Sequence, residues 1–192
     1  MWTVVILATA LLCSASAGGE LTVRYYNETQ VPAKALATAI ETASRAMRIA
    51  GVKVRWVNCY ADAAGCKDAA STTFDLVLTT AARTERVFAQ TANYSMGYSL
   101  LPKGEQGVHA KILWSRVLDY ASTHDVPAAI VLGNVMAHEI GHLLLNSGAH
   151  SRCGIMKASW SHRDSRLLGD GRMSFEGHEA AGMRRRLAAG IR

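Results

Sequence analysis

The sequence predicts an α+β domain in which a mixed sheet, drawn mainly from the first half of the chain, packs against later helices. Short β-branched and aromatic runs precede most of the helical patterns. Hydrophobic residues make up 49% of the 192 residues and charged residues 19%, which excludes a disordered chain. Because no repeat and no linker rich in Pro, Gly or Ser interrupts the sequence, we expect a single domain over residues 18–192.

Residues 1–17 have the pattern of a secretory signal peptide. Val4–Leu12 is a short apolar run, and Ala15-Ser16-Ala17 follows it as a small-residue cleavage site. The run is too short to anchor a protein stably across a bilayer core of about 30 Å. We therefore expect cleavage after Ala17 and an exported protein, secreted or periplasmic, without a transmembrane segment.

Strands and one helix are predicted in the first part of the mature chain. Leu21–Tyr26 has an alternating pattern with β-branched and aromatic residues, which predicts the first strand. A helix is expected over Pro32–Ala50, because Pro32 suits a first turn, Gly51 suits the C-terminal cap and the apolar residues fall on one stripe. Further strands are expected at Val52–Val57, Phe74–Thr80, Tyr94–Leu101 and Lys111–Val117. The last of these can also run directly into a helix.

Two helices are predicted in the second half. Asp125 and Pro127 are start signals for a helix over Ala128–Leu145. This helix is apolar almost all round, so we expect it to be buried. Ser174–Ala189 predicts a closing helix after a glycine-containing turn.

Export determines how the cysteines are interpreted. Six residues separate Cys59 from Cys66, and in an oxidising compartment we expect a local disulfide between them. A zinc ribbon is excluded, because no second cysteine pair is present to complete four ligands. Cys153 remains, either as a buried free thiol or as a thiol near the site described next.

The most informative stretch is His138-Glu139-Ile140-Gly141-His142, inside the predicted buried helix. Residues four apart share a helix face, so the imidazoles of His138 and His142 project together. This arrangement suits two ligands of one tetrahedral zinc ion. Glu139 lies beside the pair, where its carboxylate can act as general base on a water at the metal. The stretch therefore predicts one catalytic zinc ion.

A catalytic zinc ion usually has three protein ligands and one open position. We expect His150 as the third ligand, because Gly148 can let the chain leave the helix and turn back towards the metal. Glu176 and Glu179 compete for this place from a following helix. Weaker candidates are Asp164, Cys153 and His162. The remaining histidines of the mature chain, His109, His124 and His178, are expected to be surface or cap residues.

His150 and the run Gly154-Ile155-Met156 follow the HEIGH motif closely. Together these features resemble the metzincin clan of zinc metallopeptidases. The resemblance implies His138, His142 and His150 as zinc ligands, Glu139 as general base and Met156 as the methionine of a tight turn beneath the metal, the Met-turn. It also implies a zincin-like fold, with a mixed sheet packed on the active-site helix, substrate along the edge strand and a C-terminal helix after the Met-turn.

The chain departs from the clan's usual pattern, HExxHxxGxxH. Leu145 occupies the glycine position and Gly148 the position of the third histidine, so seven residues instead of five separate His142 from His150. Ala158 stands where several metzincins have a tyrosine that binds the metal or the oxyanion. The series HEIGHLLL, His-Ser and GIM is also similar to that of a group of small exported bacterial zincin-like proteins.

These observations predict an exported zinc-dependent endopeptidase that acts on a peptide or protein substrate, with Tyr94–Leu101 as the candidate edge strand for substrate pairing. The alternative is a non-catalytic secreted zinc-binding or protein-interaction module on the same fold. Glu139 favours the enzyme, because a structural zinc site has no use for an unliganded carboxylate. The formal charge of +6 permits a nucleic-acid partner, but we expect none, because no nucleic-acid-binding motif is recognisable.

Overall fold

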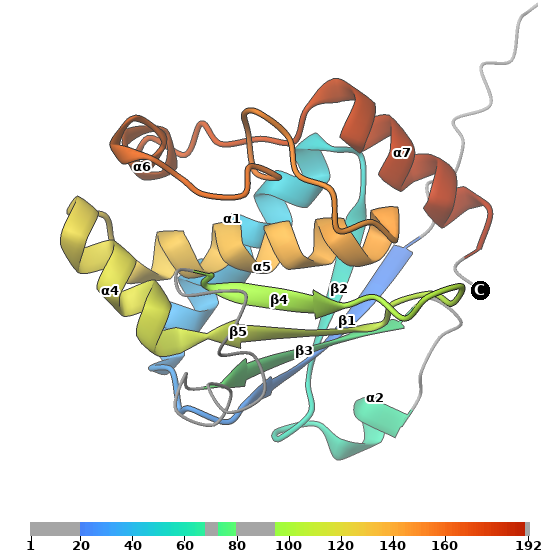
Figure 1. Cartoon of the computed structure of the whole chain (residues 1–192). Helices are drawn as coiled ribbons and strands as arrows, with labels where there is room; N and C mark the ends of the chain where they lie inside the picture. Colours follow the sequence, from blue (N-terminus) through green and yellow to red (C-terminus); the bar gives the residue numbers. More distant parts are fainter. Residues whose placement is uncertain (1–19, 68–72, 80–94, 191–192) are drawn as a thin grey trace, which may run out of the picture.

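The computed structural model describes residues 20–67, 73–79 and 95–190. The expected signal peptide lies outside the described residues, as do Thr80 and Tyr94 at the ends of two predicted strands. The described residues form an α+β fold with a mixed five-stranded sheet (Figure 1). The fold class predicted from the sequence is therefore confirmed at this level.

The sheet has the strand order β2-β1-β3-β5-β4. Its strands are β1 (Glu20–Asn27), β2 (Lys53–Asn58), β3 (Thr73–Thr79), β4 (Gly97–Leu100) and β5 (His109–Leu113). The first four strands in the spatial order are parallel to one another, and β4 runs antiparallel to β5. The described part of the sheet therefore ends in an antiparallel edge strand, β4.

Helix α1 (Ala33–Ile49) connects β1 to β2 and lies on the sheet. Its predicted stripe is turned inward, since Leu36, Ala43 and Met47 are all buried. The predicted glycine cap is also confirmed: Gly51 has a φ of 78°, its N–H donates to Arg48 O and the next N–H donates to Met47 O. This paired pattern is a Schellman motif, which ends the helix where the sequence predicted.

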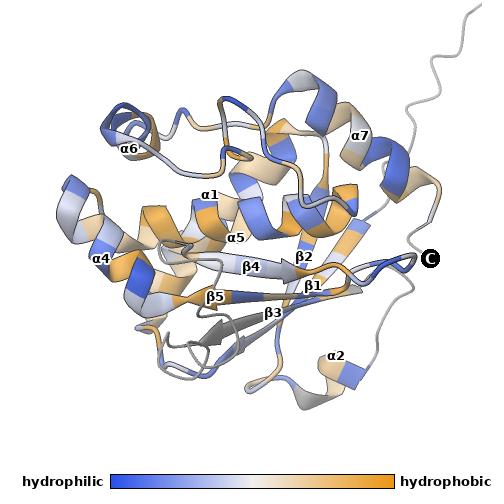
Figure 2. Cartoon of the chain, viewed as in Figure 1, coloured by the Kyte–Doolittle hydropathy of each residue, from blue (hydrophilic) through white to orange (hydrophobic). Residues whose placement is uncertain are grey.

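The longest helix, α5 (Ala128–Leu145), is the centre of the molecule. It packs against α1, against the sheet at β4 and β5, and against the helices α4 (Trp114–His124), α6 (His162–Gly169) and α7 (Gly177–Ala188). Figure 2 shows apolar residues along most of its length. By length and hydropathy alone α5 could cross a membrane, but 78% of that window is buried inside the structure, as in the core helix of a soluble protein.

The alternative left open for Lys111–Val117 is confirmed: the strand stops at Leu113, and the chain runs directly into α4. Two other predicted details are wrong. Asp125 does not start α5; it ends α4 in the left-handed conformation with a φ of 52°, and Pro127 precedes α5. Helix α6 lies in a segment for which the sequence predicted no helix.

The short helix α2 (Ala63–Lys67) lies on the opposite side of the sheet from α1 and α5 (Figure 1). The Sγ atoms of Cys59 and Cys66 lie at disulfide-bonding distance, with their Cα atoms 5.3 Å apart. The bond closes the loop that contains α2. This pair is compatible with the oxidising compartment that export implies.

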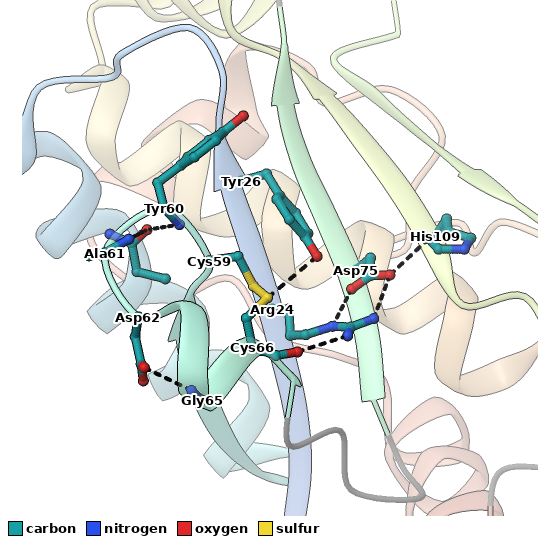
Figure 3. The surroundings of a disulfide bond; sticks show 11 residues. Arg24, Tyr26, Cys59, Tyr60, Ala61, Asp62, Gly65, Cys66, Asp75 and His109 are labelled. Carbon is teal, nitrogen blue, oxygen red and sulfur yellow. Dashed lines mark hydrogen bonds and ion pairs between the residues drawn. A yellow bond between two sulfur atoms is a disulfide. The ribbon is translucent and has the colours of Figure 1, made fainter.

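A salt bridge beneath the sheet holds this loop in place (Figure 3). The Arg24 guanidinium donates to both carboxylate oxygens of Asp75, at 2.6 and 2.8 Å, and to the carbonyl oxygen of Cys66 at 3.1 Å. The Tyr26 hydroxyl lies 3.6 Å from the Cys66 sulfur. The disulfide loop is thus attached to β1 and β3.

Replacing both Cys59 and Cys66 by Ala is expected to lower the free energy of unfolding by about 2–3 kcal/mol, because the unfolded chain regains the entropy of an open loop. For a chain of this size the melting temperature should fall by roughly 5–10 °C. Thermal unfolding followed by circular dichroism measures this. Cys153→Ser is the control, since Cys153 is exposed and free; equal melting temperatures for all three proteins would contradict the prediction.

Candidate metal centre

Three histidines from α5 and the loop after it converge on one point. The Nε2 atom of His142 lies 3.0 Å from that of His138 and 3.3 Å from that of His150. One ligand nitrogen from each of the three rings lies within 4.8 Å of the others, so the cluster could hold a metal ion. The rings of His138 and His150 are 27° from parallel, and the His142 ring is nearly perpendicular to both.

Backbone carbonyls fix the orientation of the two helical histidines. Nδ1 of His138 lies 2.7 Å from the carbonyl oxygen of Ile155, and Nδ1 of His142 lies 2.6 Å from that of Ser147. A carbonyl only accepts hydrogen bonds, so each Nδ1 donates a proton. Each Nε2 then presents a lone pair to the cluster, which is the tautomer a metal ligand needs.

Burial favours the neutral form of the same two rings. It lowers the pKa of His138 to about 4, opposed by the hydrogen bond to Ile155 and assisted by the neighbouring histidines. Burial also lowers the pKa of His142. Both imidazoles are therefore neutral and free of an Nε2 proton at physiological pH.

His150 reaches the cluster because the chain reverses at the end of α5. The reversal occurs at Asn146, which has a left-handed φ of 47°, and not at Gly148 as the sequence predicted. Asparagine tolerates this conformation better than most residues. Its side chain accepts a hydrogen bond from Gly107 N and donates one to Glu105 O, both in the β4–β5 connection. These bonds fix the start of the loop that carries His150.

The segment that contains Met156 forms a tight turn under α5. Ser151 N donates to Met156 O at 2.9 Å, and Lys157 N donates to Gly154 O at 3.3 Å. Met156 is 1% exposed, and a Cβ added to Gly141 would lie 2.5 Å from its sulfur. The glycine between the two helical histidines thus allows the methionine to pack directly against α5 at this position.

Glu139 lies next to the histidine cluster and is itself almost fully buried, at 3% exposure. Its Oε2 accepts a hydrogen bond of 2.7 Å from the Ser99 hydroxyl of β4. Burial raises the pKa of Glu139 from 4.5 to about 8, although the Ser99 hydrogen bond opposes this shift. In the metal-free protein this carboxyl group therefore keeps its proton to a higher pH than an exposed glutamate does.

This raised pKa predicts a pH-dependent difference in stability between the metal-free wild type and metal-free Glu139→Gln. Between pH 4.5 and 8 the unfolded chain releases the Glu139 proton while the folded chain retains it. Wild-type stability should therefore fall relative to the variant as the pH rises through this window, by on the order of a few kcal/mol. Melting temperatures of both proteins at pH 5 and pH 8 test this. A difference between them that does not change with pH would contradict it.

A cleft of about 480 Å³ opens beside His138 and Glu139. One wall is formed by the edge-strand segment at Met96 and Gly97. Helix α4 and the segment after the Met156 turn form the rest, through Tyr120, His124, Lys157 and Trp160. A ligand in the cleft would reach the carboxylate and one metal-binding histidine together.

The competing metal ligands lie outside the cluster and have other partners. Glu176 and Glu179 form the capping box of α7, and the Ser151 hydroxyl also donates to Glu179. Asp164 caps α6 and pairs with Lys157 at 2.5 Å. The exposed Cys153 donates to Glu176 at 2.8 Å, so the alternative of a buried thiol is wrong.

The remaining histidines are also elsewhere. His109 pairs with Asp75 at 3.2 Å, and His178 lies 3.4 Å from Glu176. The ring of His124 stacks on Tyr120, and that of His162 stacks loosely on His124.

Sequence reasoning predicted the strand that contains β4 as the place of substrate pairing, but it missed how β4 supports Glu139. Ser99 and Gly97 contact the side chain of Glu139, although about forty residues separate them from it along the chain. The edge-strand pattern was visible, but nothing in the sequence indicates which face of this strand meets α5. The available signal for this contact was the pair of small residues at alternate positions of the strand, Gly97 and Ser99.

Comparison with known proteins gives no assignment. No protein-family model matches this chain, and no curated protein sequence matches it.

Proposed function

We propose that this chain is an exported zinc-dependent endopeptidase with a zincin-like fold. The convergence of three Nε2 atoms next to a buried, unliganded glutamate carries the proposal. The mixed sheet supports it, because its antiparallel edge strand lies beside the helix that carries the HEIGH motif. So does Met156, which packs beneath that helix as a Met-turn methionine would.

The spacing of the nitrogens fits zinc. Two ligands on a tetrahedral ion with bonds of 2.0–2.1 Å are separated by about 3.3 Å. The two Nε2 separations from His142 are 3.0 and 3.3 Å. Three imidazole ligands leave one position open, and this ligand number is typical of catalytic zinc. His150 completes the set despite the two extra residues before it.

Each side chain has a definite task in this proposal. His138, His142 and His150 would hold the zinc ion, which when bound would supply Lewis-acid activation of water and of the substrate carbonyl. Glu139 accepts the proton of the attacking water and then gives it to the nitrogen of the leaving amine. The carbonyls of Ile155 and Ser147 keep the helical imidazoles directed at the metal. Hydrolysis converts one peptide bond and one water into a carboxylate and an ammonium group, so both protons of the water end on the leaving nitrogen.

The substrate has a place next to these groups. Strand β4 is one of the two edge strands of the described sheet and the one beside α5, so an extended peptide can pair with it by strand addition. The cleft beyond Gly97 can take a substrate side chain between α4 and Trp160. The scissile carbonyl would then lie between the histidine cluster and Glu139.

Digestion of a diverse mixture of unstructured peptides tests the proposal. The zinc-loaded protein should produce new peptide ends, a chelator should abolish them, and added zinc should restore them. If the protein binds one zinc ion and cleaves nothing in the mixture, the alternative of a non-catalytic zinc-binding module is favoured.

A further inference from the structure

We propose that β4 positions the Glu139 carboxylate, the general base. The Ser99 hydroxyl donates a hydrogen bond to Oε2, and the missing side chain of Gly97 leaves room for Oε1 to accept a proton from water. This inference rests on the proposed function, since it assigns separate roles to the two oxygens of the same carboxylate. Ser99 and Gly97 are positioning residues in this account, because they act through Glu139.

The register of β4 brings both residues to the helix side of the sheet. Gly97 pairs with Ile112 and Ser99 with Ala110, and these two partners on β5 are fully buried in the core. Alternate residues of a strand face the same way. Gly97 and Ser99 therefore face α5 together.

Ser99 is the hydrogen-bond donor to the carboxylate. Its hydroxyl oxygen lies 2.7 Å from Oε2 of Glu139 and 3.0 Å from the backbone carbonyl oxygen of the same residue. The Ser99 hydroxyl has one proton to donate. When Glu139 is ionised, its Oε2 is a stronger acceptor than the backbone carbonyl oxygen, and it is also the closer of the two. Oε2 is therefore engaged, and Oε1 remains to accept a proton from water.

Gly97 makes room for that second oxygen. A Cβ added at this position would lie 2.7 Å from Oε1 of Glu139, 3.0 Å from its Cγ and 3.0 Å from the carbonyl oxygen of Lys111. Contacts this short force a shift, and the rigid backbone of β5 cannot give way. A side chain here would displace the carboxylate from the place where Ser99 holds it. Gly97 also lines the cleft, so Oε1 lies at the side from which water and substrate arrive.

Ser99→Ala, Ser99→Thr and Gly97→Ala test these roles, with Ser122→Ala as a matched control on the exposed side of α4. With zinc loaded, Ser99→Ala should lower kcat by roughly 10–100-fold with little change in KM, as losses of supporting hydrogen bonds do. Ser99→Thr keeps the hydroxyl and should recover most of kcat. Gly97→Ala should lower kcat at least as much as Ser99→Ala. An unchanged kcat in Ser99→Ala would overturn the inference.

A second readout needs no activity. Crystal structures of the metal-free proteins should show one Glu139 conformation in the wild type and in Ser99→Thr. In Ser99→Ala and Gly97→Ala the carboxylate should be displaced or spread over several conformers. An unchanged, single conformation in Ser99→Ala would overturn the inference. If the wild type cleaves no peptide, the proposed function fails, while these structures still decide whether β4 positions the carboxylate.

Discussion

Glu139→Gln is expected to lower kcat for peptide hydrolysis by roughly 10²–10⁴-fold, the usual contribution of a general base, while zinc content stays at the wild-type level. The amide has nearly the shape of the carboxylate but cannot accept the proton of the attacking water. Glu139 lies outside the three-nitrogen cluster, so the metal keeps all its ligands. Steady-state kinetics on one cleaved peptide, with the metal content of each sample measured, provides the test.

The same substitution separates catalysis from folding. Glutamine can still accept a hydrogen bond from Ser99 through its amide oxygen, and it removes a buried carboxyl group whose ionised form is unfavourable. The variant should therefore be at least as stable as the wild type at pH 8. Wild-type turnover by Glu139→Gln would show that this residue is not the base.

His150→Ala is expected to weaken zinc binding by more than roughly 100-fold. Loss of a supporting group around a metal site already costs 10–100-fold in affinity, and His150 supplies one of the ligand nitrogens directly. The side chain is exposed and lies in a loop, so its removal should leave the fold intact. Competition with a chromophoric chelator measures the affinity.

His178→Ala is the matched control, because His178 is also exposed and lies outside the cluster. Zinc should raise the melting temperature of the wild type and of this control, and it should raise that of His150→Ala much less at the same zinc concentration. Full zinc affinity in His150→Ala would contradict the assignment of the third ligand.

The core of the site could be predicted because it depends on local periodicity. Helix geometry alone places His138 and His142 on one face, and the apolar surroundings in the sequence require that face to be buried. The position of His150 depends on how the chain leaves α5. The sequence suggested a glycine for this reversal, whereas the structure uses Asn146, whose side chain anchors the loop to the β4–β5 connection.

Local propensity also limited the prediction of the fold. The segment at Ile112, Trp114 and Val117 is rich in β-branched and aromatic residues, so the sequence left open both a strand to Val117 and a direct run into a helix, and the structure has the second. Asp125 was interpreted as a helix start because aspartate suits that position. It also tolerates the left-handed conformation that ends α4. Local propensity does not distinguish these two uses.

The contacts between elements could not be predicted from the sequence. Whether Ser99 faces Glu139 depends on the register of β4 against β5 and on the position of α5 above the sheet. A shift of one residue in that register would turn Ser99 away from the helix. The residues that support the Glu139 carboxylate can therefore be identified only from the folded structure.

X-ray diffraction at the zinc absorption edge, from crystals of the zinc-loaded protein, tests the metal centre most directly. We expect one anomalous peak at bonding distance from the Nε2 atoms of His138, His142 and His150, with an open position facing Glu139 and no direct bond from its carboxylate. A peak elsewhere in the molecule, or a zinc ion bound directly by Glu139, would contradict the proposed site and the role of Glu139 as base.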